Sequence, residues 1–269
     1  KLLEHLRILS SDDFEGRLTG EEGNRKGRAY IIKEFTNYKV QPLLENFEQA
    51  FTFQQDDREY KANNVLGLVK GSKYPNKYVV ISAHHDHVGV IDGEIYNGTD
   101  DNASGVAALL AFAEYLSKNP PEYSVILAAF DAEELGLWGS SFFLESFKDE
   151  DIMININMDM ISRSDKRELY MVGSRYNDKL KLVTNKFENN TNSKLIVGHD
   201  GSDGKDDWTY AADHAPFHEA GIPFLYFGNE DHKDYHQPTD DFEFVTTAFY
   251  KDAVTLIISL YALIDQEGL

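Results

Sequence analysis

The sequence Asn97-Gly98-Thr99-Asp100-Asp101-Asn102-Ala103-Ser104-Gly105 leads into a run rich in Ala and Leu, which predicts a helix over residues 102–118. The sequence Ala83-His84-His85-Asp86-His87 stands just upstream, at the end of a short apolar run that predicts a strand over residues 78–83. In α/β proteins, carboxylate and imidazole side chains at strand ends and helix starts are common components of a metal site. These two neighbouring motifs therefore predict an α/β fold that carries a metal centre at one edge of its sheet.

The predicted elements alternate in the way that a parallel sheet requires. A second apolar run, residues 124–130, follows the helix, and a strand–helix–strand order implies a right-handed crossover between parallel strands. We expect one domain, residues 1–269, with a three-layer α/β/α fold around a mixed, mostly parallel central sheet. Further strands are predicted at 47–53, 64–70, 153–161, 168–172 and 222–227, and further helices at 1–10, 22–38, 178–188 and 246–264.

The composition limits the classes of protein that remain. The chain has 269 residues, 42% of them hydrophobic and 13% aromatic, which is enough for one large buried core. A net charge of −20 disfavours nucleic-acid binding, because such a surface repels phosphate groups. The chain has no cysteine, so thiol catalysis, disulfides and cysteine–zinc sites are excluded. No apolar run of membrane-spanning length is evident, and we expect a secreted or periplasmic protein whose leader is absent from this chain.

Candidate metal ligands follow four of the predicted strands and precede one helix. The carboxyl ends of neighbouring parallel strands meet at one edge of a sheet, so side chains that are distant in the sequence are expected to converge there. The set contains two histidines and several carboxylates but no sulfur, which suits zinc better than manganese or cobalt. One catalytic zinc needs three protein ligands, whereas two metals that share a carboxylate would use the whole set. The candidates are His84, Asp86, Asp101, Glu133, Glu134, Asp159 and His236.

Each candidate also has an ordinary structural interpretation. A His-x-Asp sequence after a strand is common, and a Glu-Glu pair is most often solvated surface. Asp100 or Asp101 could be the N-cap of the following helix. Asp159 differs from these, because an aspartate among methionine and isoleucine neighbours needs a partner that offsets its burial. The joint occurrence of the candidates at strand ends is what favours a metal site.

Five motifs occur in one order along the chain, and together they resemble those of a known family. They are Ala83-His84-x-Asp86, Asp101-Asn102-Ala103-Ser104-Gly105, Glu133-Glu134-x-Gly136, Asn157-Met158-Asp159-Met160 and Tyr235-His236-x-Pro238. The chain resembles the co-catalytic dizinc exopeptidases, in particular the bacterial leucyl aminopeptidases. Glutamate carboxypeptidases, glutaminyl cyclases and the transferrin receptor ectodomain are relatives. The resemblance implies the zinc-exopeptidase fold, which is of the phosphorylase/hydrolase-like type.

The resemblance also implies which residues bind the metals. Asp101 is expected to bridge two zinc ions. His84 and Asp159 would complete the coordination of one ion, and Glu134 and His236 that of the other. No ligand position is substituted in this chain.

Two further roles follow from the same resemblance. Glu133 is expected to act as the general acid/base. Asp86 is not a ligand, and its carboxylate is expected to accept a hydrogen bond from the second ring nitrogen of His84, which fixes the tautomer of that ligand. His85 and His87 match no ligand position and are predicted to lie behind the ligands or at the surface.

The expected function is hydrolysis of the N-terminal peptide bond of peptides with a free N-terminus, by a metal-activated water and with two zinc ions as cofactors. A carboxypeptidase or dipeptidase on the same scaffold is an alternative, and it would need a basic side chain placed for the C-terminal carboxylate. A non-enzymatic, receptor-like binding domain is another alternative, against which the intact ligand set argues. A glutaminyl cyclase is disfavoured, because that branch works with one zinc. The sequence indicates neither the preferred N-terminal residue nor the oligomeric state.

Overall fold

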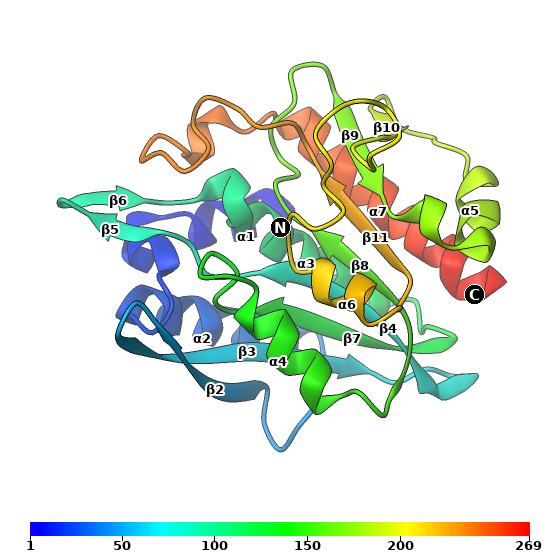
Figure 1. The fold of residues 1–269 in the computed structure, drawn as a ribbon, viewed down its shortest axis with the longest axis horizontal. Helices are drawn as coiled ribbons and strands as arrows, with labels where there is room; N and C mark the ends of the chain where they lie inside the picture. Colours follow the sequence, from blue (N-terminus) through cyan, green and yellow to red (C-terminus); the bar gives the residue numbers. More distant parts are fainter.

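The computed structural model describes residues 1–269, which are organised around one mixed sheet of nine strands (Figure 1). The strands occur in the order β1-β3-β7-β4-β8-β11-β9-β10, and β2 pairs with β3 outside this order. A separate two-stranded ribbon, β5–β6, projects at the left of Figure 1. The strands are β1 (Gln41–Pro42), β2 (Glu48–Gln55), β3 (Arg58–Val69), β4 (Tyr74–His84), β5 (Gly89–Ile91), β6 (Glu94–Tyr96), β7 (Tyr123–Phe130), β8 (Asp151–Met158), β9 (Glu168–Val172), β10 (Lys194–Val197) and β11 (Phe224–Gly228).

The centre of the sheet is parallel and its flanks are largely antiparallel. β4 runs parallel to both of its neighbours, β7 and β8, and β8 runs parallel to β11. β3 is antiparallel to β7, β1 and β2, and β9 is antiparallel to β11 but parallel to β10. The predicted fold, a mixed sheet flanked by helices, is confirmed, and its parallel pairs are concentrated where the candidate ligands lie.

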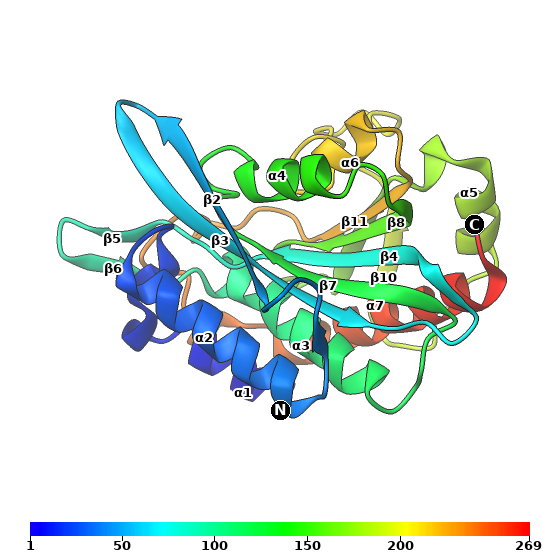
Figure 2. The same cartoon turned by 90° about the horizontal axis from the view of Figure 1, so that it is seen from below.

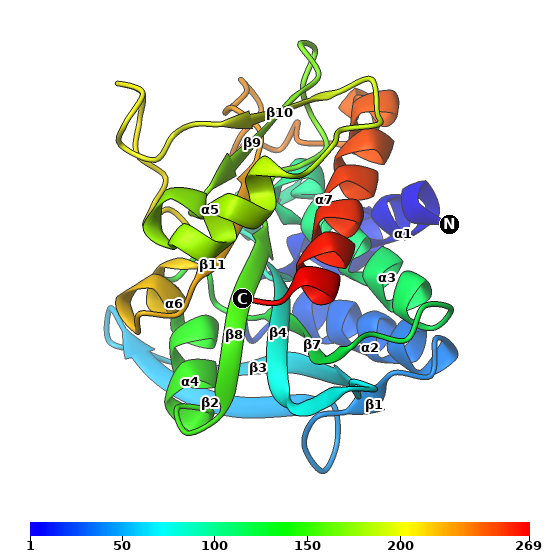
Figure 3. The same ribbon diagram turned by 90° about the vertical axis from the view of Figure 1, so that its right-hand side faces the viewer.

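Helices cover both faces of the sheet (Figure 2 and Figure 3). α1, α2, α3 and α7 lie on one face, and α4 and α6 lie on the other. α5 packs against α7 near the β10 edge. The helices are α1 (Leu2–Leu9), α2 (Glu22–Asn37), α3 (Gly105–Leu116), α4 (Trp138–Ser146), α5 (Asp178–Asn185), α6 (Ala215–Glu219) and α7 (Thr247–Glu267).

The alternation of side chains along β4 explains the two helical layers. Val79 and Ile81 belong to the large apolar core that α3 and α7 cover. Val80 points to the opposite face and packs with Phe143 of α4 and Phe217 of α6. A strand that is covered on both faces consists almost entirely of apolar residues, which is why its sequence alone identified it.

The structure differs from the predicted elements near the site. The helix predicted from residue 102 begins at Gly105, because the backbone of Asp101 and Asn102 is not helical. The strand predicted up to residue 161 ends at Met158, so Asp159 lies just beyond it. β1, β5, β6, β10, α4 and α6 were not expected, since segments of two to nine residues carry too little periodicity to be identified.

α7 is the one helix that is long and apolar enough to cross a membrane by length and composition, with a mean hydropathy of 1.4. A helix buried in a protein core meets the same criterion, and half of this apolar window is buried. Phe249, Leu256 and Ile257 of α7 are fully or almost fully buried in the core shared with α3. The structure therefore places this apolar run against the sheet.

One buried arginine connects the N-terminal segment to the turns at the carboxyl edge of the sheet. Arg17 is 1% exposed and donates hydrogen bonds to the carbonyl oxygens of Leu9, His85, Asn97 and Gly98 at 2.7–3.0 Å. Burial lowers the pKa of its guanidinium to about 10, against the opposing effect of nearby carboxylates, so the group stays charged at neutral pH. Arg17 thus holds together segments that flank the candidate ligands.

We predict that Arg17→Met lowers the free energy of unfolding by about 3 kcal/mol or more, because it leaves the buried carbonyl oxygens of Leu9, His85 and Asn97 without a donor. The fourth acceptor, the carbonyl oxygen of Gly98, keeps the N–H of Ala103 as a donor. Urea unfolding followed by circular dichroism measures this loss. Arg25→Met is the matched control, because Arg25 is exposed and pairs only with Glu22 on the same helix, and it should change stability little. Equal effects of the two substitutions would contradict the role assigned to Arg17.

Candidate metal centre

The candidate ligands lie at the carboxyl edge of the parallel strands. His84 is the last residue of β4, Asp159 follows β8, and Glu133-Glu134 follows β7. His236 comes from the loop after β11. Because β7, β4, β8 and β11 are neighbours in the sheet, their carboxyl ends bring these side chains to one place.

Two groups of side chains converge there, each with a histidine between carboxylates. In the first group, Nε2 of His84 is 3.2 Å from Oδ1 of Asp101 and 3.3 Å from Oδ1 of Asp159. In the second group, Nε2 of His236 is 3.0 Å from Oδ2 of Asp101 and 3.1 Å from Oε2 of Glu134. Asp101 thus presents one oxygen to each group, as a bridging carboxylate would.

The turn that carries Asp101 is fixed by its surroundings. The backbone N–H groups of Asp100 and Asp101 donate to Oδ2 of the buried Asp240 at 2.9 and 3.2 Å. Gly98 has a φ of +54°, and a Cβ at this position would lie 2.2 Å from the carbonyl oxygen of Asp101, so glycine is required. The N-cap interpretation of Asp100 or Asp101 is not found, because α3 has no side-chain cap and Asp100 instead accepts hydrogen bonds from Ser162.

Three residues beside or within the site have left-handed backbone conformations. Ala132 has a φ of +59°, Met160 of +56° and His236 of +53°. Such conformations are uncommon outside glycine, and they persist where the surrounding structure holds them. The backbone at this edge is therefore determined by tertiary contacts and not by local preference.

The two adjacent glutamates have different environments. Glu134 is bound through both oxygens, since Oε1 is 2.7 Å from Nδ1 of His87 and Oε2 is 3.1 Å from Nε2 of His236. Glu133 lies with His84 and Asp159 in the first group, and its carboxylate forms no hydrogen bond or ion pair. Of the two glutamates, Glu133 is therefore the one whose carboxylate has no polar partner in the protein.

Asp86 lies beside His84, and the predicted hydrogen bond from His84 to its carboxylate stays a prediction. Nδ1 of His84 lies 3.2 Å from the backbone carbonyl oxygen of Asp86 but 3.7 Å from the carboxylate Oδ1, so the backbone supplies the closer acceptor. The carboxylate of Asp86 accepts hydrogen bonds from the backbone N–H groups of Glu133 and Glu134 at 3.1 and 3.3 Å. Asp86 thus orients His84 through its main chain and both glutamates through its side chain.

Burial and crowding shift the ionisation of the cluster. Burial lowers the pKa of His84, but the carboxylates of Glu133 and Asp159 outweigh it and raise the pKa well above its usual range. Burial raises the pKa of Glu133 well above its usual range and also raises that of Asp159. Burial opposes ionisation of Asp101 as well, but the facing histidines hold its pKa well below the usual range. These shifts are typical of crowded, buried carboxylates, whose ionised form is stabilised by a nearby positive charge.

The donor set fits zinc. It offers imidazole nitrogens and carboxylate oxygens, and no lysine or arginine pairs with the clustered carboxylates. His84, Asp101 and Asp159 could hold one ion. Asp101, Glu134 and His236 could hold a second.

His85 and His87, which were predicted to lie behind the ligands or at the surface, are both buried but have different surroundings. His85 is buried outside both groups, with Nε2 3.1 Å from the carbonyl oxygen of Asn63. His87 is fully buried and contacts Glu134 of the second group. His87 belongs to none of the ligand motifs. Its position one residue after Asp86 is the only feature of the sequence that indicates a place near the site.

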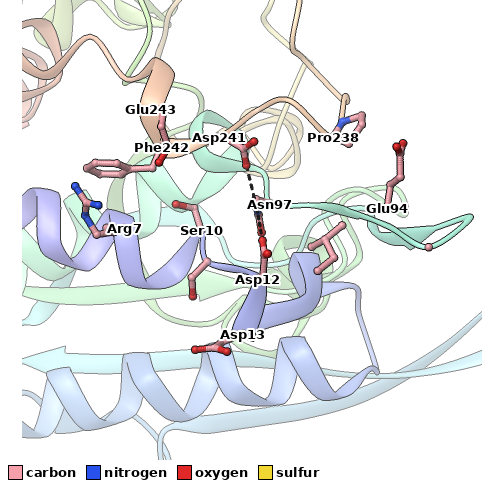
Figure 4. Close-up of a pocket in the computed structure, with 13 residues that line it drawn as sticks. Arg7, Ser10, Asp12, Asp13, Glu94, Asn97, Pro238, Asp241, Phe242 and Glu243 are labelled. Carbon is pink, nitrogen blue, oxygen red and sulfur yellow. Dashed lines mark hydrogen bonds between the residues drawn. The ribbon is translucent and has the colours of Figure 1, made fainter.

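A cavity of about 760 Å³ lies outside the candidate site (Figure 4). Figure 4 shows Asn97 between Asp12 and Asp241, and its side-chain amide donates to both carboxylates, at 2.9 and 3.0 Å. None of the candidate metal ligands lines this cavity. The cavity and the candidate metal centre are therefore separate features of the molecule.

Known proteins that are similar to this chain include aminopeptidases and a glutaminyl cyclase. The chain is 27% identical over 231 residues to aminopeptidase YwaD of Bacillus subtilis (strain 168), which covers 81% of this chain and 47% of that protein. The chain thus spans about half the length of this curated relative. The solved structure of the aminopeptidase from Aneurinibacillus sp. strain AM-1 matches with a TM-score of 0.75 at 16% identity, over 97% of this chain and 92% of that chain. That of Fimbriiglobus ruber glutaminyl cyclase matches with a TM-score of 0.73 at 17% identity, over 98% and 93%.

The structural matches establish a shared fold, and the sequence establishes the family. Residues 64–261, most of the chain, match the sequence profile of peptidase family M28. This segment contains all of the candidate ligands, from His84 to His236. The chain therefore belongs to peptidase family M28.

Proposed function

We propose that this protein is a dizinc aminopeptidase, which removes the N-terminal residue from peptides. The observation that carries the proposal is the position of Asp101, whose two oxygens face two separate groups of histidine and carboxylate. Membership of peptidase family M28 supports a metallopeptidase, and the relative YwaD is named an aminopeptidase. Because the chain spans about half of that relative, the activity of the whole protein is part of the proposal. Its secreted or periplasmic location stays a prediction.

In the proposed reaction, the zinc ions activate a water molecule and Glu133 transfers its proton. When bound, a pair of zinc ions supplies Lewis acidity and brings the pKa of a bound water from about 15.7 to about 7. Glu133 takes up the proton of the attacking water, whose oxygen adds to the scissile carbonyl carbon. Glu133 then delivers this proton to the leaving amine as the C–N bond breaks. Burial raises the pKa of Glu133, which favours retention of the proton between the two steps.

The charged groups around the site favour a substrate with a free amine over one recognised by its carboxylate. A carboxypeptidase would need a free basic side chain near the metals. Arg17 is fully engaged by four carbonyl oxygens, and Arg163 pairs with Asp234 at 2.7 Å. The net charge of −20 favours binding of the cationic N-terminus of a peptide over binding of its C-terminal carboxylate.

We predict two zinc ions per chain in the zinc-reconstituted protein, measured by elemental analysis after removal of free metal. Asp101→Ala should reduce the content below two, because it removes the oxygen that faces each group. Asp12→Ala, which removes an exposed carboxylate outside the site, is the control and should retain both ions. One ion per chain in the unmodified protein would refute the two-metal centre.

We predict that Glu133→Gln lowers kcat by about 10²–10⁴-fold while the zinc content stays unchanged, since glutamine keeps the shape but cannot accept the proton. Glu134→Gln is the matched partner, because it changes the adjacent residue and should lower zinc affinity instead. Steady-state kinetics and metal analysis on both variants separate the two roles. A Glu133→Gln variant with near-normal kcat would show that another group is the base.

We predict hydrolysis of Leu- and Ala-p-nitroanilide, no hydrolysis of their N-acetyl forms, and loss of activity with a chelator that added zinc restores. Acetylation removes the free α-amine, by which an aminopeptidase recognises the N-terminal residue of its substrate. A panel of C-terminally varied, N-blocked dipeptides tests the alternative. Their cleavage, without release from the free-amine substrates, would replace the aminopeptidase by a carboxypeptidase.

A further inference from the structure

His87 lies inside the second group of the site. Its side chain is fully buried, and Nδ1 is 2.7 Å from Oε1 of Glu134 and 3.7 Å from Oδ2 of Asp101. Its ring centroid is 5.7 Å from that of His236. Gly98 packs against the ring, since a Cβ at that position would lie 2.4 Å from it. His87 is therefore enclosed on several sides beside the carboxylate that it contacts.

The second ring nitrogen distinguishes His87 from a metal ligand. A histidine that binds a metal through one nitrogen almost always donates the N–H of the other to an oxygen. His84 has such a partner, because its Nδ1 lies 3.2 Å from the carbonyl oxygen of Asp86. Nε2 of His87 is buried and has no hydrogen-bond partner. An N–H at Nε2 would be an unsatisfied buried donor, so a neutral His87 favours the tautomer that carries its hydrogen on Nδ1.

The contact with Glu134 requires the same tautomer. An ionised carboxylate only accepts hydrogen bonds, so a distance of 2.7 Å between Oε1 and Nδ1 requires a hydrogen on Nδ1. We infer that His87 is a positioning residue, which donates Nδ1–H to Oε1 of Glu134 and so presents Oε2 to the second metal. This inference rests on the two-metal centre proposed above.

The bond gives Glu134 a defined orientation. The side chain of Glu134 is 11% exposed, and apart from His87 its carboxylate contacts only His236, which is itself 39% exposed on its side chain. With Oε1 engaged by His87, only Oε2 remains for an ion between His236 and Asp101. Without the donor, the carboxylate is free to rotate, so the affinity for the second ion falls.

The test compares two substitutions that differ in one hydrogen-bond donor. Asparagine places its amide nitrogen where Nδ1 of histidine stands, whereas alanine leaves no donor. We expect His87→Ala to weaken binding of the second zinc by about 10–100-fold and His87→Asn to stay within about threefold of the unmodified protein. Competition titration with a chromophoric zinc chelator measures both affinities. Equal losses in the two variants would make His87 a direct ligand, and no loss in either would make it a bystander; each result overturns the inference.

A second readout does not depend on mutation or on activity. Long-range ¹H–¹⁵N NMR of the zinc-loaded protein, labelled on its histidines, reports which ring nitrogen of His87 carries the hydrogen. We expect hydrogen on Nδ1 and a free Nε2. Hydrogen on Nε2 would overturn the inference. The number of ions per chain in the unmodified protein separately decides the proposed two-metal centre.

His5 supplies the matched control for loss of a buried imidazole. It is 6% exposed in α1, and its Nδ1 lies 2.7 Å from the hydroxyl oxygen of Tyr30, so it makes a contact of the same length away from the site. His5→Ala and His5→Asn should leave the affinity for the second zinc unchanged. A loss as large as that of His87→Ala would assign the effect to general destabilisation.

Discussion

Mutual repulsion among four carboxylates, those of Asp101, Glu133, Glu134 and Asp159, is the constraint on which the rest of this structure depends. The four converge around three imidazoles, in a place where burial weakens the screening by water. Such a cluster persists only if rigid elements hold its members in place. Three of the carboxylates are attached at or just beyond the ends of central strands, and Asp240 fixes the turn that carries the fourth. Arg17 connects the flanking turns through their carbonyl oxygens.

Much of the fold could be predicted from the sequence because the decisive signals are local. Residues 78–83 and 124–130 are continuous apolar runs, since both faces of these strands are covered, and β4 and β7 lie where they were expected. The candidate ligands could be predicted because each stands at a strand end or in a turn next to a helix. Their convergence then follows from the topology of a parallel sheet.

The remaining features could not be predicted because they arise from contacts between distant segments. α3 begins three residues later than expected, since the backbone of Asp101 and Asn102 is set by tertiary contacts that no helix propensity reflects. The carboxylate of Asp86 was expected to face His84, and the structure adds two donors that the sequence did not indicate, the backbone N–H groups of Glu133 and Glu134. The contact between His87 and Glu134 joins residues 47 positions apart, and nothing in the neighbouring sequence indicates it.

The division of Asp101 between two groups also connects the site to the folding of the whole chain. The ligand candidates extend from His84 to His236, so neither group is complete until distant parts of the chain have met. An unfolded chain offers an ion only scattered donors, and an ion that binds the native state alone shifts the folding equilibrium towards that state by mass action. Free zinc concentration thereby becomes a determinant of stability as well as of chemistry. Depletion of the ion would increase the unfolded population, and with it the exposure of the chain to proteolysis.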